Sequence, residues 1–328
     1  MSDSLVSFKQ LRIDVRVTRS RRLRIVDSAS FDVGHGQLMG LIGESGSGKT
    51  MLCRSLVGTL GRRGAYIESG ELNFDGHDLV KASKQDWREI RGKKIGYIPQ
   101  SALAGPNPVI TIGDQLSEAI RQGEMIDRDS IHKRSLELLE MVQIRRPDVV
   151  LKQYSYQLSG GMKQRVMIAC AIAQNPKLIV ADEPTTGLDV TVQAEIMDLL
   201  REIRRNFNTS IILVSHDLQL INSICDDVVV MHAGATVEKL PSSKIEHALH
   251  PYTHALYNSR IDLVEPRGKL VTIKGQPPTV GDWPQGCRFA DRCDYVQDKC
   301  RIGSQMELIT AESGHQTACI KYKEIFKG

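Results

Sequence analysis

The stretch QLMGLIGESGSGKT, residues 37–50, decides the fold of this 328-residue chain. A short apolar run is followed directly by GESGSGKT, which has the spacing of a phosphate-binding P-loop between a strand and a helix. Glycines let the backbone wrap closely, so that successive N–H groups and the helix N-terminus can hold a phosphate group. The sequence therefore predicts a strand, a loop and a helix that bind a nucleotide through its phosphates.

The polar residues of this loop have distinct expected roles. We expect Lys49 to reach the β- and γ-phosphates and the Thr50 hydroxyl to bind Mg²⁺. The remaining candidate nucleotide-binding residues of the loop are Gly43, Ser45, Gly46 and Gly48. The alternative is a glycine-rich turn with a chance lysine, which the strand-loop-helix context disfavours.

A second motif, KLIVADEP at residues 177–184, predicts a buried strand that ends in two carboxylates. Asp182 stands where it can face the metal ion held by the P-loop, as a strand-end acid does in nucleotide enzymes. Glu183 follows it and is the natural group to polarise the attacking water. A solvated acidic pair in a loop is the alternative, and the apolar run before the pair disfavours it.

The pattern along the rest of the chain predicts an α/β fold. A third buried strand is expected at 210–216, and the segment before it has helical spacing, so strands and helices alternate as in a parallel sheet. The opening segments alternate apolar and polar residues as antiparallel strands do. Residues 105–175 are expected to form a helical subdomain and 242–259 a helix. A domain boundary near residue 250 divides the chain into 1–250 and 251–328.

Composition is that of a globular protein, with 41% apolar and 25% charged residues. The sequence contains neither the ~18 consecutive apolar residues that span a bilayer nor a secretory signal, so we expect a cytosolic chain. A net charge of +4 does not indicate a nucleic-acid partner. Structural disulfides are not expected in that compartment.

A third motif, LSGGMKQR at residues 158–165, resembles the signature of ATP-binding cassette (ABC) ATPases. Ser159, Gly160 and Gly161 open a helix, where free N–H groups and the helix dipole favour an anion. The resemblance implies that these residues bind the γ-phosphate of ATP held by the opposite subunit. It also implies a P-loop NTPase cassette with a RecA-like core, an antiparallel β-subdomain and a helical subdomain.

Three further positions match the family one by one. Gln100, which ends KKIGYIPQ, corresponds to the glutamine that senses metal and water and connects them to the membrane subunits. His216 in LVSHD corresponds to the histidine that contacts the γ-phosphate. Asp189 in TTGLD corresponds to the aspartate that crosses the dimer interface. The resemblance thus implies Glu183, His216 and Gln100 as catalytic residues, and Thr50, Gln100 and Asp182 around Mg²⁺.

Four cysteines crowd the C-terminal part of the chain, namely Cys287, Cys293, Cys300 and Cys319. Four thiolates suit either a zinc ion or an iron–sulfur cluster, and unligated thiols are a third alternative. The surrounding HPYTHALYNS and KGQPPTVGDWPQGCRFADRC resemble the C-terminal extension of oligopeptide/dipeptide-type ABC importers. Some members of that subfamily carry a [4Fe–4S] cluster there, so the resemblance favours a cluster over zinc.

The resemblance implies a transport ATPase on the cytoplasmic face of the inner membrane, powering uptake of di- or oligopeptides. Its expected partners are a second, homologous ATPase subunit, two transmembrane permease subunits and an extracytoplasmic binding protein. Nickel or another small solute is the alternative cargo. A soluble ABC ATPase acting on ribosomes or DNA is the alternative from a different class, although only one cassette is present and no long coiled coil is evident.

Overall fold

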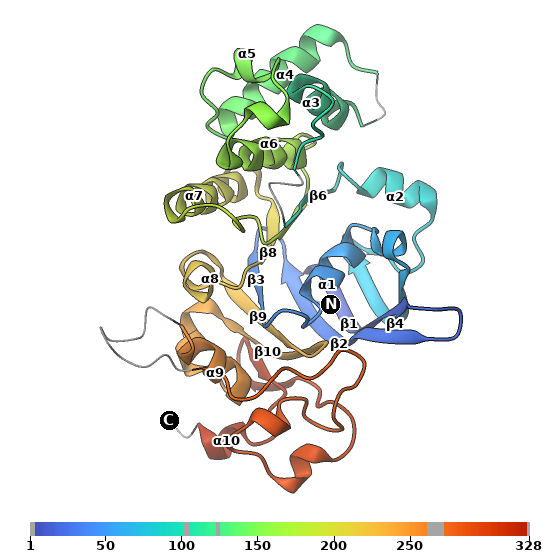
Figure 1. Cartoon of the computed structure of the whole chain (residues 1–328), viewed down its shortest axis with the longest axis vertical. Helices are drawn as coiled ribbons and strands as arrows, with labels where there is room; N and C mark the ends of the chain where they lie inside the picture. Colours follow the sequence, from blue (N-terminus) through green and yellow to red (C-terminus); the bar gives the residue numbers. More distant parts are fainter. Residues whose placement is uncertain (1–3, 101–104, 123–124, 261–271, 327–328) are drawn as a thin grey trace. The chain divides into compact units, whose positions relative to one another are not determined.

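The computed structural model describes residues 4–100, 105–122, 125–260 and 272–326. Its contacts divide the chain into two compact units (Figure 1). The first unit consists of Met1–Gly34, Leu38–Lys81 and Ser215–Gly328, and the second of His35–Gln37 and Ala82–Val214. Each candidate site residue therefore belongs to one of these two units.

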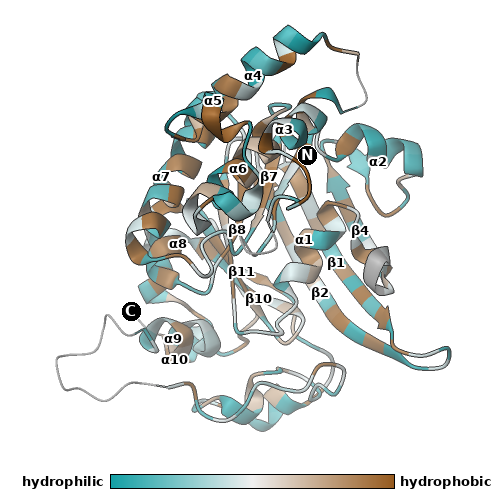
Figure 2. Ribbon diagram, turned by 45° about the horizontal axis from the view of Figure 1, so that its top comes forward, coloured by the Kyte–Doolittle hydropathy of each residue, from teal (hydrophilic) through white to brown (hydrophobic). Residues whose placement is uncertain are grey.

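The first unit begins with antiparallel strands. They are β1 (Ser4–Arg16), β2 (Arg22–Gly34), β4 (Ala65–Phe74) and β5 (His77–Asp78). β1 lies between β2 and β4, and hydrophobic and hydrophilic residues alternate along much of β1 and β2 (Figure 2). Phe8 of β1 stacks on Phe31 of β2 with ring centroids 4.5 Å apart, and both are buried. The alternation therefore places one face of these strands in the core, as the sequence predicts.

Three more strands connect this layer to the P-loop. They are β3 (Leu38–Ile42), β9 (Asp227–His232) and β10 (Ala235–Pro241). β3 pairs in parallel with β9, β9 pairs antiparallel with β10, and β10 meets β2. Every residue of β3 is buried, which is typical of a strand covered on both faces.

Short helices complete the first unit before its C-terminal part. They are α1 (Lys49–Leu56), the 3₁₀ helix η1 (Leu60–Arg63), α8 (Leu218–Ile224), the 3₁₀ helix η4 (Ser242–His247) and α9 (Pro251–Asn258). The expectation of one helix over 242–259 is wrong. Because Pro251 disfavours helical backbone at the residue before it, the chain is extended at His250 and α9 begins afresh.

The C-terminal part of the first unit contains little regular structure. Its elements are the 3₁₀ helices η6 (Ala290–Arg292) and η7 (Asp298–Arg301), the strands β11 (Ile309–Glu312) and β12 (His315–Thr317), and α10 (Tyr322–Ile325). β12 pairs antiparallel with β10. These residues share one compact unit with the N-terminal strands, and the boundary near residue 250 stays a prediction.

The second unit has a parallel sheet of β6 (Ile95–Ile98), β7 (Leu178–Asp182) and β8 (Ser210–Val214). β7 lies between the other two, and all its residues are buried. Between β7 and β8 runs α7 (Val190–Phe207), whose buried residues recur at helical spacing. The mixed α/β sheet expected from the sequence is confirmed.

The remaining helices of the second unit are α2 (Lys84–Ile90), α3 (Ile112–Arg121), α4 (Arg128–Met141), α5 (Pro147–Val150), the 3₁₀ helix η3 (Ser155–Gln157) and α6 (Gly160–Ile172). Among them α3, α4 and α6 contact one another, and α5 contacts α4 (Figure 1). α6 also packs on β6. None of the helices within the described ranges is long and apolar enough to cross a bilayer.

Candidate nucleotide-binding site

The P-loop joins β3 to α1 in the first unit, and its glycines adopt backbone conformations that other residues rarely reach. Gly43, Gly46 and Gly48 have φ values of 146°, 80° and 104°. A Cβ on Gly43 would lie 2.1 Å from the carbonyl oxygen of Met231. The loop therefore lies directly against β9, and only glycine fits at this position.

Lys49 is buried in the loop, with 7% of its surface exposed. Its Nζ donates to the carbonyl oxygens of Gly43 at 2.7 Å and Glu44 at 3.0 Å, and to Ser47 Oγ at 3.3 Å. The ammonium group is thus folded back onto the loop. Phosphate oxygens are stronger acceptors than these neutral groups, so a bound nucleotide would draw Lys49 away from them.

His216 lies on the surface of the first unit at the turn that begins α8. The turn is ordered by its neighbours, because Asp217 N–H donates to Ser215 Oγ at 3.0 Å. The Asp217 carboxylate accepts from the N–H groups of Gln219 at 2.9 Å and Leu220 at 3.1 Å. His216 is therefore held on a capped turn with its side chain exposed.

In the second unit the structure brings Gln100 and Glu183 together. Gln100 Nε2 donates to Glu183 Oε2 at 3.1 Å, and Thr186 Oγ1 donates to the same oxygen at 2.9 Å. Glu183 has a φ of 50°, an uncommon conformation for a residue with a side chain. Asp182, 1% exposed at the end of β7, accepts a 3.4 Å hydrogen bond from the Tyr97 hydroxyl. Both carboxylates are thus oriented by polar neighbours.

The signature residues open α6, as their sequence predicts. Ser159 is the N-cap, and its Oγ accepts from Met162 N–H at 3.3 Å. The next two residues, Gly160 and Gly161, begin the helix, and no acidic residue lies in its first turn. Ser159 and Gly160 are exposed, so the positive end of the helix is open to an anion.

Asp189 lies beside this helix start within the second unit. It caps α7, and its Oδ1 accepts from Val192 N–H at 3.0 Å. A Cβ on Gly161 would lie 2.9 Å from Val192 Cγ1, and one on Gly160 would lie 3.4 Å from Leu188. The signature and the TTGLD segment therefore pack together, and glycine makes that close approach possible.

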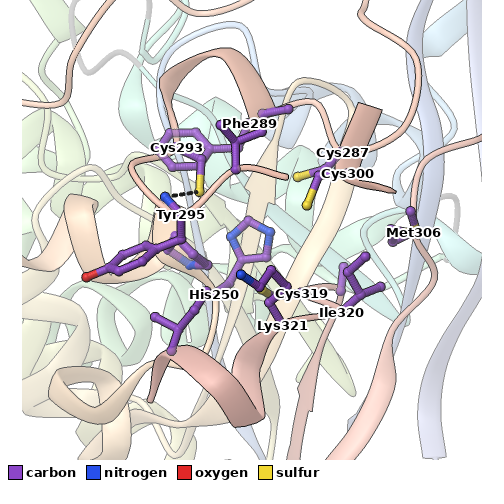
Figure 3. Close-up of a pocket in the computed structure, with 15 residues that line it drawn as sticks. His250, Cys287, Phe289, Cys293, Tyr295, Cys300, Met306, Cys319, Ile320 and Lys321 are labelled. Carbon is purple, nitrogen blue, oxygen red and sulfur yellow. Dashed lines mark hydrogen bonds between the residues drawn. The ribbon is translucent and has the colours of Figure 1, made fainter. Parts of the chain in front are cut away.

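The four C-terminal cysteines line one small pocket in the first unit, together with His250, Phe289 and other side chains (Figure 3). Cys287 and Cys300 point their sulfurs toward the same space, and Tyr295 N–H donates to Cys293 Sγ at 3.4 Å. Burial raises the pKa of Cys287 to about 11 and that of Cys319 to about 12. Without a metal ion nearby, these thiols therefore stay protonated at neutral pH.

The pocket does not by itself show a metal site. Among the residues that the structure describes, no three His, Cys, Asp or Glu side chains are placed to hold a metal ion. Neither a zinc ion nor an iron–sulfur cluster is therefore confirmed.

A P-loop on a buried strand, a strand-end acid pair and a helix opened by Ser-Gly-Gly define a P-loop ATPase of the ABC class. The chain belongs to the ABC transporter family, because residues 26–186 match the family described as ABC transporter. Residues 237–300 match the family described as oligopeptide/dipeptide transporter, C-terminal region.

Similar proteins agree with this assignment. The oligopeptide transport ATP-binding protein AppD of Bacillus subtilis is 40% identical over 300 residues, which covers 91% of each chain. The dipeptide transport ATP-binding protein DppD of Escherichia coli K12 is 38% identical and covers 92% of this chain and 91% of its own. The solved structure of cbiO1 from Clostridium perfringens has a TM-score of 0.64 at 24% identity, covering 75% of this chain and 92% of its own. The chain is accordingly an ABC-family ATPase, and the structural likeness supports its cassette fold.

Proposed function

We propose that this chain is the ATP-hydrolysing subunit of an ABC importer that takes up di- or oligopeptides. One observation carries the proposal: a single chain joins the cassette to a segment matching the oligopeptide/dipeptide transporter C-terminal region. Relatives at 38–40% identity that cover nine-tenths of the chain are named as oligopeptide or dipeptide transport proteins. Nickel or another small solute is the alternative cargo for the same machinery.

The site residues suit ATP hydrolysis between two cassettes. Lys49 and the N–H groups of the P-loop would bind the β- and γ-phosphates, while residues 159–161 would bind the γ-phosphate of ATP on the partner cassette. The 3.1 Å hydrogen bond from Gln100 supports a role for Glu183 in orienting the attacking water, since it fixes one carboxylate oxygen. His216 would contact the γ-phosphate from its exposed turn, and Asp189 would reach the partner cassette.

Magnesium is the cofactor that the family implies. Bound Mg²⁺ neutralises charge on the phosphates during their transfer. Thr50 in the first turn of α1 and Asp182 at the end of β7 are the oxygen donors that suit it, and Gln100 is a third. All three are oxygen ligands of the kind that magnesium prefers, so the donor set fits the ion.

The cysteine pocket has the number of thiols that a [4Fe–4S] cluster binds, one through each iron atom. Three of the four, Cys287, Cys293 and Cys300, lie within residues 237–300, which match the oligopeptide/dipeptide transporter C-terminal region. We therefore propose that Cys287, Cys293, Cys300 and Cys319 hold a [4Fe–4S] cluster.

The proposed assembly contains a second, homologous ATPase subunit, two transmembrane permease subunits and an extracytoplasmic binding protein. The composite ATP site supports the second ATPase, since each such site needs a signature helix from a partner cassette. In this assembly the chain lies on the cytoplasmic face of the membrane.

Reconstitution tests the proposal. The chain is coexpressed with the products of adjacent genes, and the purified complex is placed in proteoliposomes with ATP and labelled di- or oligopeptides. We expect ATP-dependent peptide accumulation that the Glu183→Gln complex does not support. Accumulation of nickel without peptide would transfer the assignment to the alternative cargo, and stable association with ribosomes or DNA in place of membrane proteins would overturn it.

A further inference from the structure

Glu44, the second residue of the P-loop motif, forms a bidentate salt bridge with Arg292, which lies 248 residues later in the chain. Arg292 Nη1 lies 2.7 Å from Glu44 Oε2, and Arg292 Nη2 lies 2.8 Å from Glu44 Oε1. The Arg292 side chain is 4% exposed and the Glu44 side chain 22%. Paired, charge-assisted hydrogen bonds of this kind fix direction as well as distance.

The backbone of Glu44 belongs to the phosphate cradle itself. Its N–H donates to the Tyr252 hydroxyl at 2.8 Å, and its carbonyl oxygen accepts from Lys49 Nζ at 3.0 Å and from Ser47 N–H at 3.2 Å. Tyr252 is fully buried in α9. A movement of the Glu44 side chain would therefore move the peptide groups around Lys49.

Arg292 is itself held by the C-terminal segment. It ends η6, and its Nε donates to the carbonyl oxygen of Lys274 at 2.7 Å. Its guanidinium lies over the Phe289 ring, 5.6 Å from the centroid, and Phe289 and the adjacent Cys293 both line the cysteine pocket (Figure 3). The same short segment thus lines the pocket on one side and binds the P-loop on the other.

A neighbouring histidine also lies near the Glu44 carboxylate. His232 Nδ1 lies 3.6 Å from Glu44 Oε2, but burial and the adjacent Arg292 lower the pKa of His232 to about 3. His232 is therefore neutral at physiological pH, and Arg292 supplies the positive charge that Glu44 faces.

We infer that Arg292 is a positioning residue for ATP binding, which holds Glu44 and thereby keeps the P-loop in the conformation that receives phosphate. The affinity for nucleotide consequently depends on the C-terminal segment, because that segment sets the place of Arg292. An ordered loop loses less conformational freedom on binding a ligand than a mobile loop does. By keeping the P-loop ordered, Arg292 therefore increases the affinity for nucleotide. The inference rests on the proposed function only in assigning the ATP phosphates to the P-loop, and it requires no metal in the cysteine pocket.

The test compares Arg292→Met, Arg292→Lys and Glu44→Gln in the complete transporter complex, with a fluorescent ATP analogue for affinity and steady-state ATP hydrolysis for KM and kcat. We expect Arg292→Met to raise Kd and KM about tenfold, which is the effect expected for the loss of one charged, hydrogen-bonded pair. The value of kcat at saturating ATP should change less than about twofold. Arg292→Lys should recover part of the affinity. The double variant Arg292→Met, Glu44→Gln should have the same Kd and KM as the single variant with the larger increase.

Arg301→Met is the matched control, since Arg301 of η7 pairs on an exposed face with Asp291, which lies beside Arg292 in η6. It should leave KM unchanged. An unchanged KM in Arg292→Met, or an equal rise in Arg301→Met, would overturn the inference. If Arg292→Met fails to assemble, Arg292→Lys and Glu44→Gln test the inference instead. Each should raise KM while leaving kcat nearly unchanged. Full ATP affinity in Lys49→Met would instead contradict the nucleotide assignment of the P-loop.

Discussion

Gln100 donates a 3.1 Å hydrogen bond to the carboxylate of Glu183 in the second unit. Thr186 donates to the same oxygen at 2.9 Å, so Oε2 of Glu183 has two donors. Gln100 follows β6 and Glu183 follows β7, and these strands are parallel neighbours. The carboxyl ends of neighbouring parallel strands meet at one edge of a sheet, and here they place the Glu183 carboxylate beside the Gln100 amide.

Replacing Glu183 with Gln keeps its shape and removes its charge. We expect ATP hydrolysis by the assembled complex to fall about 100-fold or more, in the range for loss of a positioned base, while ATP binding is retained. Steady-state hydrolysis and nucleotide binding measure the two effects. Asp198→Asn, which removes an exposed carboxylate paired with Arg201 in the same unit, should leave the rate unchanged. Wild-type hydrolysis in Glu183→Gln would refute the assigned role.

Gly161→Ala tests the signature helix. The added methyl group would lie 2.9 Å from Val192 Cγ1, so either the Val192 side chain or the start of α6 must shift. We expect the assembled complex to lose about tenfold or more of its ATPase rate, as on removal of an oriented anion-binding donor. ATP binding to the isolated chain should be unaffected, because the signature acts on the nucleotide of the partner.

Gly61→Ala is the control for this variant, since a Cβ at Gly61 meets nothing within 4 Å among the described residues. A normal ATPase rate in Gly161→Ala would show that close contact between these two segments is unnecessary.

His232 makes folding stability depend on pH. Burial and the positive charges of Arg292 and Arg288 lower its pKa from 6.5 to about 3. The unfolded chain binds a proton more readily, so this contribution is fully present above pH 6.5 and is lost as pH falls toward 3. His250 and Glu44 face the same ring.

The check is thermal unfolding as a function of pH. Wild-type protein should lose stability between pH 6.5 and 4, and His232→Gln should lose less over that interval. Parallel curves for the two proteins would contradict the assignment to His232. His35→Gln provides a control at an exposed histidine.

The cysteine pocket predicts a specific metal content. Anaerobically purified protein should contain iron and acid-labile sulfide near one cluster per chain, and Cys293→Ser should lose both. Cys225→Ser is the matched control, because this buried thiol ends α8 and lies outside the pocket lining. Zinc without sulfide would contradict the cluster, and protein free of both would indicate unligated thiols.

Much of the site could be predicted because its residues act locally. The P-loop glycines, the acids after β7 and the N-cap Ser159 depend on short segments whose backbone is set by the residues within them. Sequence reasoning missed the pair of Glu44 and Arg292, since no local pattern links residues 248 positions apart.

The unexpected features of the fold have the same origin. The break before α9 follows from Pro251, a local signal that the expectation of one helix over 242–259 overlooked. The pairing of β12 with β10, by contrast, is a long-range contact that neither short strand indicates by itself. Arg292 carries one usable signal, because a buried arginine requires a partner, but burial in an irregular segment was not visible in the sequence.

A nucleotide-bound structure of the assembled transporter, trapped with Glu183→Gln and ATP, tests the central claim most directly. The claim is that two cassettes clasp each nucleotide between the P-loop of one and the signature helix of the other. We predict that Lys49 contacts the phosphates of one ATP, and that residues 159–161 contact the γ-phosphate of the ATP on the partner P-loop. Residues 159–161 turned away from every phosphate would contradict the claim.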